Sequence, residues 1–223
     1  MTLYAGNSLT GAIYKGDQLI CSSSGGNGGS SGTTDVELTR ISDDTGTEIG
    51  TWYMNFADGS GNEYKVVCLD AQYRNSSTQW CSNKSTTTNM PTYNNNVSKW
   101  WYDAKETATQ NTQLILDYCS AGGYTSSSCS HCRSQSFAIG GVTYYGQLPN
   151  IREVFDMWRH RAQINQMDTS ASSHSSTNFS SACSIWSSNQ SSGFGWLLSN
   201  LGYVNTGTKM NKDLACPVLE LPM

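Results

Sequence analysis

Three cysteines have the residue type and the spacing that could bind a metal ion. Cys129 and Cys132 form a Cys-x-x-Cys pair, and Cys119 lies ten residues before it. Structural zinc sites use four Cys or His ligands, and His131 lies between the paired cysteines, where it would rarely bind the same ion. We therefore expect no metal and no cofactor, and we interpret the three cysteines as a loop disulfide or free thiols in preference to zinc ligands.

Nucleophilic catalysis would need a Ser or Cys beside a His that an acid orients. The three histidines are His131 and His174, in Ser-rich segments, and His160, near the basic end of a predicted helix. A His in that helical position more often interacts with the helix dipole than acts as a base. The sequence also has no Gly-x-Ser-x-Gly motif, and its Gly-rich run at 25–29 lacks the Lys and the helix of a phosphate-binding loop.

Paired carboxylates are another catalytic arrangement, because glycoside hydrolases use two of them. The candidates Asp156, Asp168 and Asp213 are scattered along the chain, and the sequence does not pair them. We therefore expect a binding protein without catalytic residues.

The composition excludes two classes of partner. The net charge is −4, only 13% of the residues are charged, and the 13 Lys and Arg are spread along the chain, so we expect no nucleic-acid binding. No apolar run approaches the roughly 20 residues of a membrane span, and the start of the chain lacks the basic and apolar segments of a signal peptide. We therefore expect neither membrane insertion nor export by that route.

The elements that must position any site begin with a separate N-terminal segment. Within residues 1–21, alternating residues at 3–5 and 12–15 predict two short strands. Residues 22–34 consist almost only of Ser, Gly, Asn and Thr, which is typical of a flexible linker. The remainder, 35–223, is long enough for one domain with its own core.

Two helices are predicted in this domain. Apolar residues recur at helical spacing over 98–118 and include Trp101, Ala104 and Ile115. In the second helix, Asn150 can cap the first turn and Glu153 can complete a capping box. Its predicted buried stripe consists of Ile151, Val154, Phe155, Trp158 and Ala162.

The other segments predict short strands and loops. Strands are expected at 51–56 and 64–69 and then, near the C-terminus, at 184–187, 195–199, 202–204 and 215–221. The polar segments 74–97 and 167–181 are expected to be surface loops. Two helices with a small, twisted, mostly antiparallel sheet define the α+β class.

A series of C-terminal landmarks resembles one family. It comprises Ile185-Trp186-Ser187-Ser188, Gly195-Trp196, Gly202-Tyr203-Val204-Asn205, Lys209 and Cys216-Pro217-Val218, after Gln147-Leu148-Pro149-Asn150 and Glu153-Val154. This order is similar to that of the C-type-lectin-fold adhesins of bacteriophages and gut bacteria, including members diversified by retroelements. The resemblance covers about residues 100–221 and implies a C-type-lectin-like domain behind a short β-type anchor segment.

The chain departs from the family pattern at two points. The span from Trp196 to Gly202 is one residue shorter, and Cys216 occupies the place of an Arg before Pro217-Val218. We expect a contact between Cys183 and Cys216 to replace the missing Arg, as a packed thiol pair in preference to a disulfide.

In the diversified members, side chains from the Trp-Ser-Ser strand to the last strand form the ligand-binding face. Carried onto this sequence, the resemblance implies a binding set of Asn189, Gln190, Phe194, Trp196, Leu198, Asn200, Tyr203, Asn205, Thr206, Thr208, Lys209 and Asn211. Such a mixture suits recognition, because aromatic side chains supply contact area and Asn and Thr supply adaptable hydrogen bonds.

The resemblance implies a phage receptor-binding protein, such as a tail-fibre tip, that binds a host-surface glycan or protein. The phrase Leu3-Tyr4-Ala5-Gly6-Asn7 and the similar phrase after it resemble N-terminal segments of phage tail and fibre proteins. This segment would dock on another virion protein, and the protein is expected to be a homotrimer, made in the host cytoplasm and carried on the virion. The alternative is a capsid or tail decoration protein whose lectin-like domain makes only virion contacts.

Overall fold

The computed structural model describes the strand backbone at 13–15 and 18–21 and, with side chains, residues 36–83, 104–179, 184–191, 193–199 and 202–223. The chain divides into two compact units, Met1–Thr33 and Thr34–Met223.

The first unit contains β1 (Ile13–Lys15) and β2 (Gln18–Cys21), which pair antiparallel. The strand predicted at 12–15 corresponds to β1, whereas the one predicted at 3–5 lies outside the described residues.

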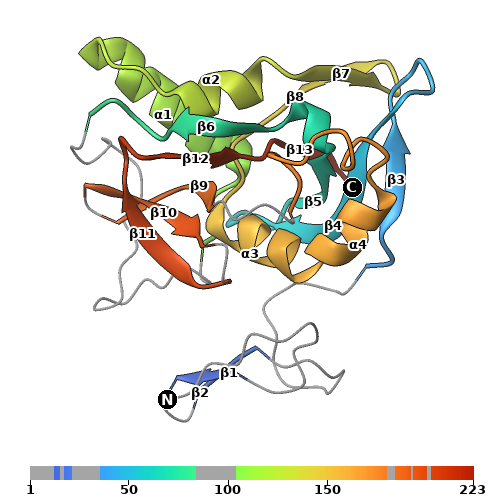
Figure 1. The fold of residues 1–223 in the computed structure, drawn as a ribbon, viewed down its shortest axis with the longest axis horizontal. Coiled ribbons are helices and arrows are strands. Elements are labelled where there is room, and N and C mark those ends of the chain that lie inside the picture. The colour runs from blue at the N-terminus through green and yellow to red at the C-terminus, as the bar shows by residue number, and fades with distance from the viewer. Residues whose placement is uncertain are drawn as a thin grey trace. The chain divides into compact units, whose positions relative to one another are not determined.

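The second unit is α+β and contains an antiparallel four-stranded sheet (Figure 1). Its order is β13 (Val218–Pro222), β5 (Glu63–Leu69), β4 (Glu48–Ala57) and β3 (Thr39–Ser42). Strands β4 and β5 contain the two strands predicted from alternation. Both faces are buried in the middle, since Phe56 and Val66 belong to one apolar cluster and Ile49 and Val67 to another.

A five-stranded sheet is built mainly from the C-terminal third of the chain. Its order is β11 (Val204–Thr208), β10 (Phe194–Leu198), β9 (Ile185–Ser191), β12 (Lys212–Ala215) and β6 (Asn75–Gln79). Strand β12 runs parallel to β9, and the other neighbours are antiparallel. The chain passes between the two sheets from β5 to β6 through residues 70–74 and again from β12 to β13 through Cys216 and Pro217.

Three strand predictions need correction. The strand predicted at 215–221 is divided, because Ala215 ends β12 of one sheet and Val218 begins β13 of the other. Strand β6 lies inside the segment 74–97 that was predicted to be a surface loop, and Trp80 just after it is fully buried. The sequence of β6 is polar and lacks alternation, so nothing in it predicts a strand. The strand forms because it pairs with β12. The strand predicted at 202–204 begins only at Val204, because Gly202 occupies a turn with φ of 82°.

The helix after β6 begins later than the periodicity predicts. Helix α1 (Ala108–Gly122) starts with a capping box between Thr107 and Gln110, although the helix was predicted over 98–118. The carboxylate of Glu220 on β13 accepts hydrogen bonds of 2.8 and 2.9 Å from the free amides of Ala108 and Thr109. This cap fixes the start at 108, and Trp101 lies outside the described residues.

The predicted capping box of the second helix is confirmed. Asn150 accepts from the amides of Arg152 and Glu153 at 2.9 and 3.0 Å, and Glu153 accepts from the amide of Asn150 at 2.7 Å. The helix is divided into α3 (Ile151–Arg159) and α4 (Arg161–Met167), where the single predicted helix had no break.

The predicted buried stripe of this helix is only partly buried. Ile151 and Val154 are fully buried, Phe155 and Trp158 are partly exposed, and Ala162 is exposed. Two further elements that the sequence did not predict are α2 (Ser127–Arg133) and the hairpin of β7 (Ser136–Ile139) and β8 (Val142–Tyr145).

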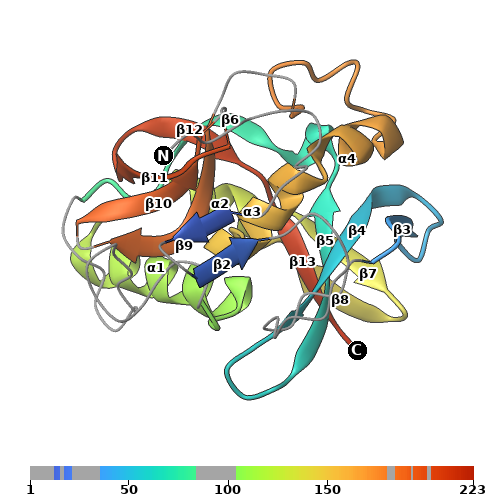
Figure 2. The ribbon, with the colours of Figure 1, turned by 90° about the horizontal axis from the view of Figure 1, so that it is seen from below.

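Helix α3 holds the two sheets together. It packs on β9 and β10 of the five-stranded sheet and on β4 of the four-stranded sheet. Figure 2 shows it between these two groups of strands. Helix α3 therefore supports the β10–β11 hairpin through β10 and is itself held by its contact with β4.

Candidate ligand-binding surface

The twelve residues implied as a binding set are divided between the surface and the core. Phe194, Tyr203, Asn205 and Asn211 are exposed, and Thr206 and Thr208 are partly buried. In contrast, the structure buries Asn189, Gln190, Trp196, Leu198 and Lys209. Asn200 lies outside the described residues.

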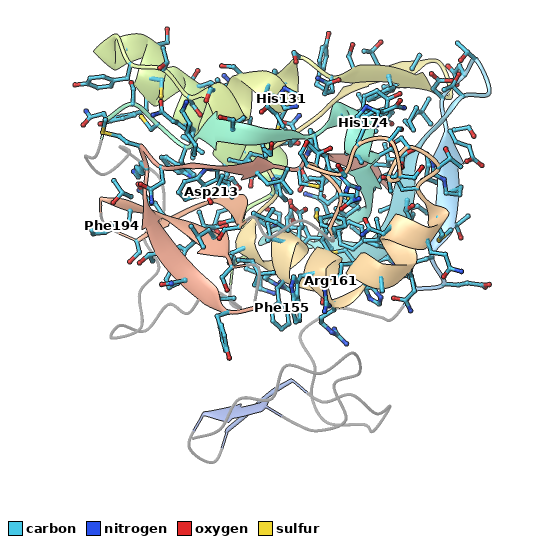
Figure 3. All side chains as sticks on the ribbon, in the orientation of Figure 1. His131, Phe155, Arg161, His174, Phe194 and Asp213 are labelled. Atoms are coloured by element: carbon cyan, nitrogen blue, oxygen red, sulfur yellow. The ribbon has the colours of Figure 1, made fainter. Side chains whose placement is uncertain are left out.

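The exposed members lie along the β10–β11 hairpin and the turn between β11 and β12. We call them, together with Met210 in that turn, the hairpin surface: Phe194, Tyr203, Asn205, Thr206, Thr208, Met210 and Asn211. Among the residues described with side chains, seven large hydrophobics are exposed, and the hairpin surface holds three of them, Phe194, Tyr203 and Met210. Figure 3 shows Phe194 at the outer end of the hairpin.

Two buried tryptophans hydrogen-bond to the strands beside this hairpin. The indole of Trp80 donates a hydrogen bond of 2.7 Å to the carbonyl of Ser187 on β9. The indole of Trp186 on β9 donates one of 3.0 Å to the carbonyl of Thr78 on β6. Because both indole groups are buried and satisfied, they hold the strands in a single register.

Glycines allow the tryptophans to approach the hairpin. A Cβ at Gly195 would lie 2.9 Å from the Trp80 ring and 3.0 Å from the Trp186 ring, and one at Gly207 would lie 3.1 Å from the Trp186 ring. Gly195 and Gly207 are direct partners across β10 and β11. A larger residue at either position would move the hairpin off the indole rings.

The buried members of the implied set have structural contacts. The side chain of Asn189 accepts a hydrogen bond of 2.7 Å from the amide of Ile151, so it binds the start of α3. Lys209 Nζ donates to Gln190 Oε1 at 2.9 Å and lies 4.1 Å from the centroid of the Trp80 ring. Burial lowers the pKa of Lys209 to about 8. Their local sequence gives no sign of this burial, since Asn and Lys usually lie on the surface.

The turn that leads into β11 rests on an aromatic side chain that the implied set did not include. At Gly202, a Cβ would lie 2.2 Å from the ring of Trp158 on α3. The guanidinium of Arg161, at the start of α4, lies 4.0 Å from the centroid of the same ring. Arg161 and Phe155 are labelled in Figure 3 along α3 and α4. Trp158 therefore supports the backbone next to Tyr203.

Four of the six cysteines that the structure describes with side chains form two close pairs. Cys81 Sγ lies 3.4 Å from Cys119 Sγ, and Cys68 Sγ lies 3.7 Å from Cys216 Sγ. The expected partner of Cys216, Cys183, lies outside the described residues. In the part of the chain that the structure describes, no group of three or more His, Cys, Asp or Glu is arranged to hold a metal ion.

The His and Asp residues considered for catalysis each contact a different partner. His131 Nε2 lies 2.8 Å from the carbonyl of Tyr73, and His174 Nδ1 lies 3.1 Å from the carbonyl of Ser170. Asp156 pairs with Arg159 at 3.0 Å, and Asp168 pairs with Arg74 at 3.4 Å in the core.

Asp213 on β12 is half-buried, and burial raises its pKa to about 6. Within the described ranges, no helix is long and apolar enough to cross a membrane.

Comparison of the chain with protein-family models, with curated proteins and with solved structures gives no match. A function for this protein is therefore inferred from the fold and from the hairpin surface.

Proposed function

We propose that this protein is a phage virion receptor-binding protein, and that its second unit is a C-type-lectin-like domain that binds a host-surface ligand through the hairpin surface. The observation that carries the proposal is the contrast between the two sides of one hairpin. Aromatic and polar side chains are exposed on one side of this hairpin, and the other side packs against the buried rings of Trp80 and Trp186.

This contrast suits recognition for a physical reason. Phe194 and Tyr203, with exposed fractions of 48% and 40%, offer apolar contact area at low entropy cost. Asn205 and Asn211 offer donors and acceptors beside them. Because Trp80, Trp186 and Trp158 already fix the backbone, little conformational entropy is lost when a ligand binds.

The proposed ligand is a glycan or a protein of the host surface. The net charge of −4 on 223 residues provides little electrostatic steering, so shape and hydrogen bonding would determine specificity. The N-terminal segment would dock on other virion proteins, and trimeric display would raise a weak single-site affinity through effective concentration.

A capsid or tail decoration protein is the second candidate, and the position of β11 favours it. Strand β11 is an edge of the five-stranded sheet, and an edge strand can pair with a strand of another protein. In that case the hairpin surface would be covered in the virion.

The two candidates differ in what a change at Tyr203 should affect. Virions carrying Tyr203→Ala should assemble normally and adsorb to their host at least tenfold more slowly. The matched control is Tyr145→Ala, which removes an exposed tyrosine of β8 that lies outside the hairpin surface. Equal adsorption of the two variants would contradict the receptor-binding proposal, and loss of assembly in Tyr203→Ala alone would favour the decoration protein.

A further inference from the structure

Cys81 and Cys119 place two sulfur atoms in contact between elements far apart in the sequence. Cys81 follows β6, Cys119 lies in the last turns of α1, and both residues are buried. Their Sγ atoms are 3.4 Å apart. A disulfide bond is about 2.05 Å long, so the sulfurs need to approach by only about 1.4 Å.

The hydrogen bonds around the pair assign different roles to the two sulfurs. The two thiols share a hydrogen bond, and the amide of Asn83 donates to the Cys81 sulfur at 3.4 Å, whereas no such amide contact is made to Cys119 among the described residues. With the nearby Lys209 ammonium, these contacts lower the pKa of Cys81 to about 6. The pKa of Cys119 is raised, because its proton is held in the shared hydrogen bond. The lowered pKa of Cys81 favours its thiolate form, which is the reactive form of a cysteine.

The other described cysteines lack this arrangement. Cys68 and Cys216 are 3.7 Å apart, but burial raises the pKa of Cys68 well above its usual value. Burial also raises the pKa of Cys129 to about 12 and that of Cys132. Because the thiolate is the reactive form, these thiols should be slow to oxidise at neutral pH.

We propose that Cys81 and Cys119 are a redox modification site, at which a peroxide converts the two thiols into a disulfide. The Cys81 thiolate attacks one peroxide oxygen, so that an S–O bond forms, the O–O bond breaks and hydroxide leaves. The Cys119 sulfur then attacks the Cys81 sulfur, the S–S bond forms, and the S–O oxygen leaves as water with the Cys119 proton. Overall, two thiols are oxidised and one hydrogen peroxide is reduced to two waters.

The disulfide would connect α1 to the backbone below the hairpin surface. The amide of Cys81 donates a hydrogen bond of 3.1 Å to the carbonyl of Lys209, in the turn between β11 and β12. Cross-linking Cys81 to Cys119 would therefore restrain this turn. The inference rests on the thiol geometry and does not depend on the proposed function.

The test uses the full chain, reduced, freed of reductant and treated with one equivalent of hydrogen peroxide at pH 7.5. We expect the intact mass to fall by about 2 Da as two hydrogens are lost. We also expect the Tm to rise by roughly 5 to 10 °C, since the bond restrains the unfolded chain. Digestion with chymotrypsin as well as trypsin separates Cys119 from Cys129, because it cuts after Tyr118 and Tyr124. The non-reduced digest should contain Cys81 joined to Cys119.

Two variants provide the matched comparison. Cys216→Ala should still lose about 2 Da and give the same cross-linked peptide, whereas Cys119→Ala should not form it. The proposal is overturned if the wild-type chain keeps its mass, or if its digest joins Cys68 to Cys216 or Cys81 to another cysteine. The wild-type digest decides the matter even where a variant does not fold.

Discussion

Lys209 Nζ and Gln190 Oε1 are joined by a hydrogen bond of 2.9 Å, and neither side chain is exposed to solvent. The bond connects the turn after β11 to β9 and places an ammonium group against the Trp80 ring. A fully buried lysine is rare unless it is paired, so this contact is part of the structure that holds the hairpin.

The first prediction concerns the pH dependence that Lys209 contributes. Burial lowers its pKa from 10.5 to about 8 in the folded protein. Between these values the unfolded chain binds a proton that the folded protein has lost, so this residue makes the free energy of unfolding rise with pH from about 8 to 10.5. In Lys209→Met this contribution should be absent, so the slope of the free energy of unfolding against pH should be lower than in the wild-type protein by the amount that Lys209 supplies. Urea unfolding at several pH values, with reductant present, measures it.

The control for this prediction is Lys212→Met, because Lys212 is exposed on β12. The control should keep the slope of the wild-type protein. Equal slopes for the two variants would show that Lys209 is not the group responsible.

The second prediction concerns Gly202 and its contact with Trp158. Gly61 and Gly202 have nearly the same φ, 84° and 82°, but a Cβ at Gly61 would meet nothing within 4 Å. Gly61→Ala should therefore cost only backbone strain, about 1 kcal/mol. Gly202→Ala should cost about 3 kcal/mol, because Trp158 must also move. Denaturant unfolding gives both values.

The double variant with Trp158→Ala separates packing from strain. Removal of the ring should make Gly202→Ala cost no more than Gly61→Ala, since the clash is gone. An unchanged cost would mean that the ring does not limit this turn.

The third prediction concerns the buried ion pair of Arg74 and Asp168. The guanidinium lies 3.4 Å from the carboxylate and also donates to the carbonyl of Leu69 at 2.9 Å. Arg74→Met leaves the carboxylate buried without its cation and should lower the free energy of unfolding by about 3 to 5 kcal/mol. Hydrogen exchange should also increase over 168–179, because Arg74 binds the carbonyl of Thr177 there.

Arg159→Met is the matched control, since Arg159 pairs with Asp156 at 3.0 Å but is partly exposed. It should cost less than Arg74→Met, because the side chains of Arg159 and Asp156 retain exposures of 22% and 10%, whereas those of Arg74 and Asp168 retain none. Comparable losses in the two variants would contradict a special role for the buried pair.

The fourth prediction concerns Asp213, whose pKa burial raises from 3.8 to about 6. Between these values the folded protein binds a proton that the unfolded chain has lost, so this residue makes stability fall as pH rises from 3.8 to 6. Asp213→Asn should remove that contribution and raise the Tm at pH 7. Thermal unfolding from pH 4 to pH 7 measures the change.

Asp117→Asn provides the comparison, because Asp117 is exposed on α1. It should leave the pH profile of the wild-type protein unchanged. A higher Tm in both variants would reflect net charge rather than the burial of Asp213.

Local chemistry explains which elements the sequence could predict. Asn150 and Glu153 lie three residues apart and cap a helix by direct contact, so their spacing predicts its start. Strands β4 and β5 could also be predicted from their own apolar residues, although their burial does not alternate because both faces of the sheet are covered.

Distant partners explain the rest. Gln190 and Lys209 are polar residues that the fold buries around Trp80, more than a hundred residues away in the sequence. Strand β6 is recognisable only through β12. The strands of the β10–β11 hairpin were predicted close to their observed positions, but the division of their side chains into exposed and buried required the contacts of Trp80 and Trp186.

The short connection between β12 and β13 has a consequence for how the protein folds. Only Cys216 and Pro217 separate a strand of one sheet from a strand of the other, and the paired residues of β6 and β5 lie between 133 (Lys212 and Gln79) and 158 (Pro222 and Tyr64) positions earlier. Neither sheet is therefore complete until residues 212–222 have paired with β6 and β5. Contacts of such long sequence separation slow folding. The two sheets should form in one slow, cooperative step rather than one after the other.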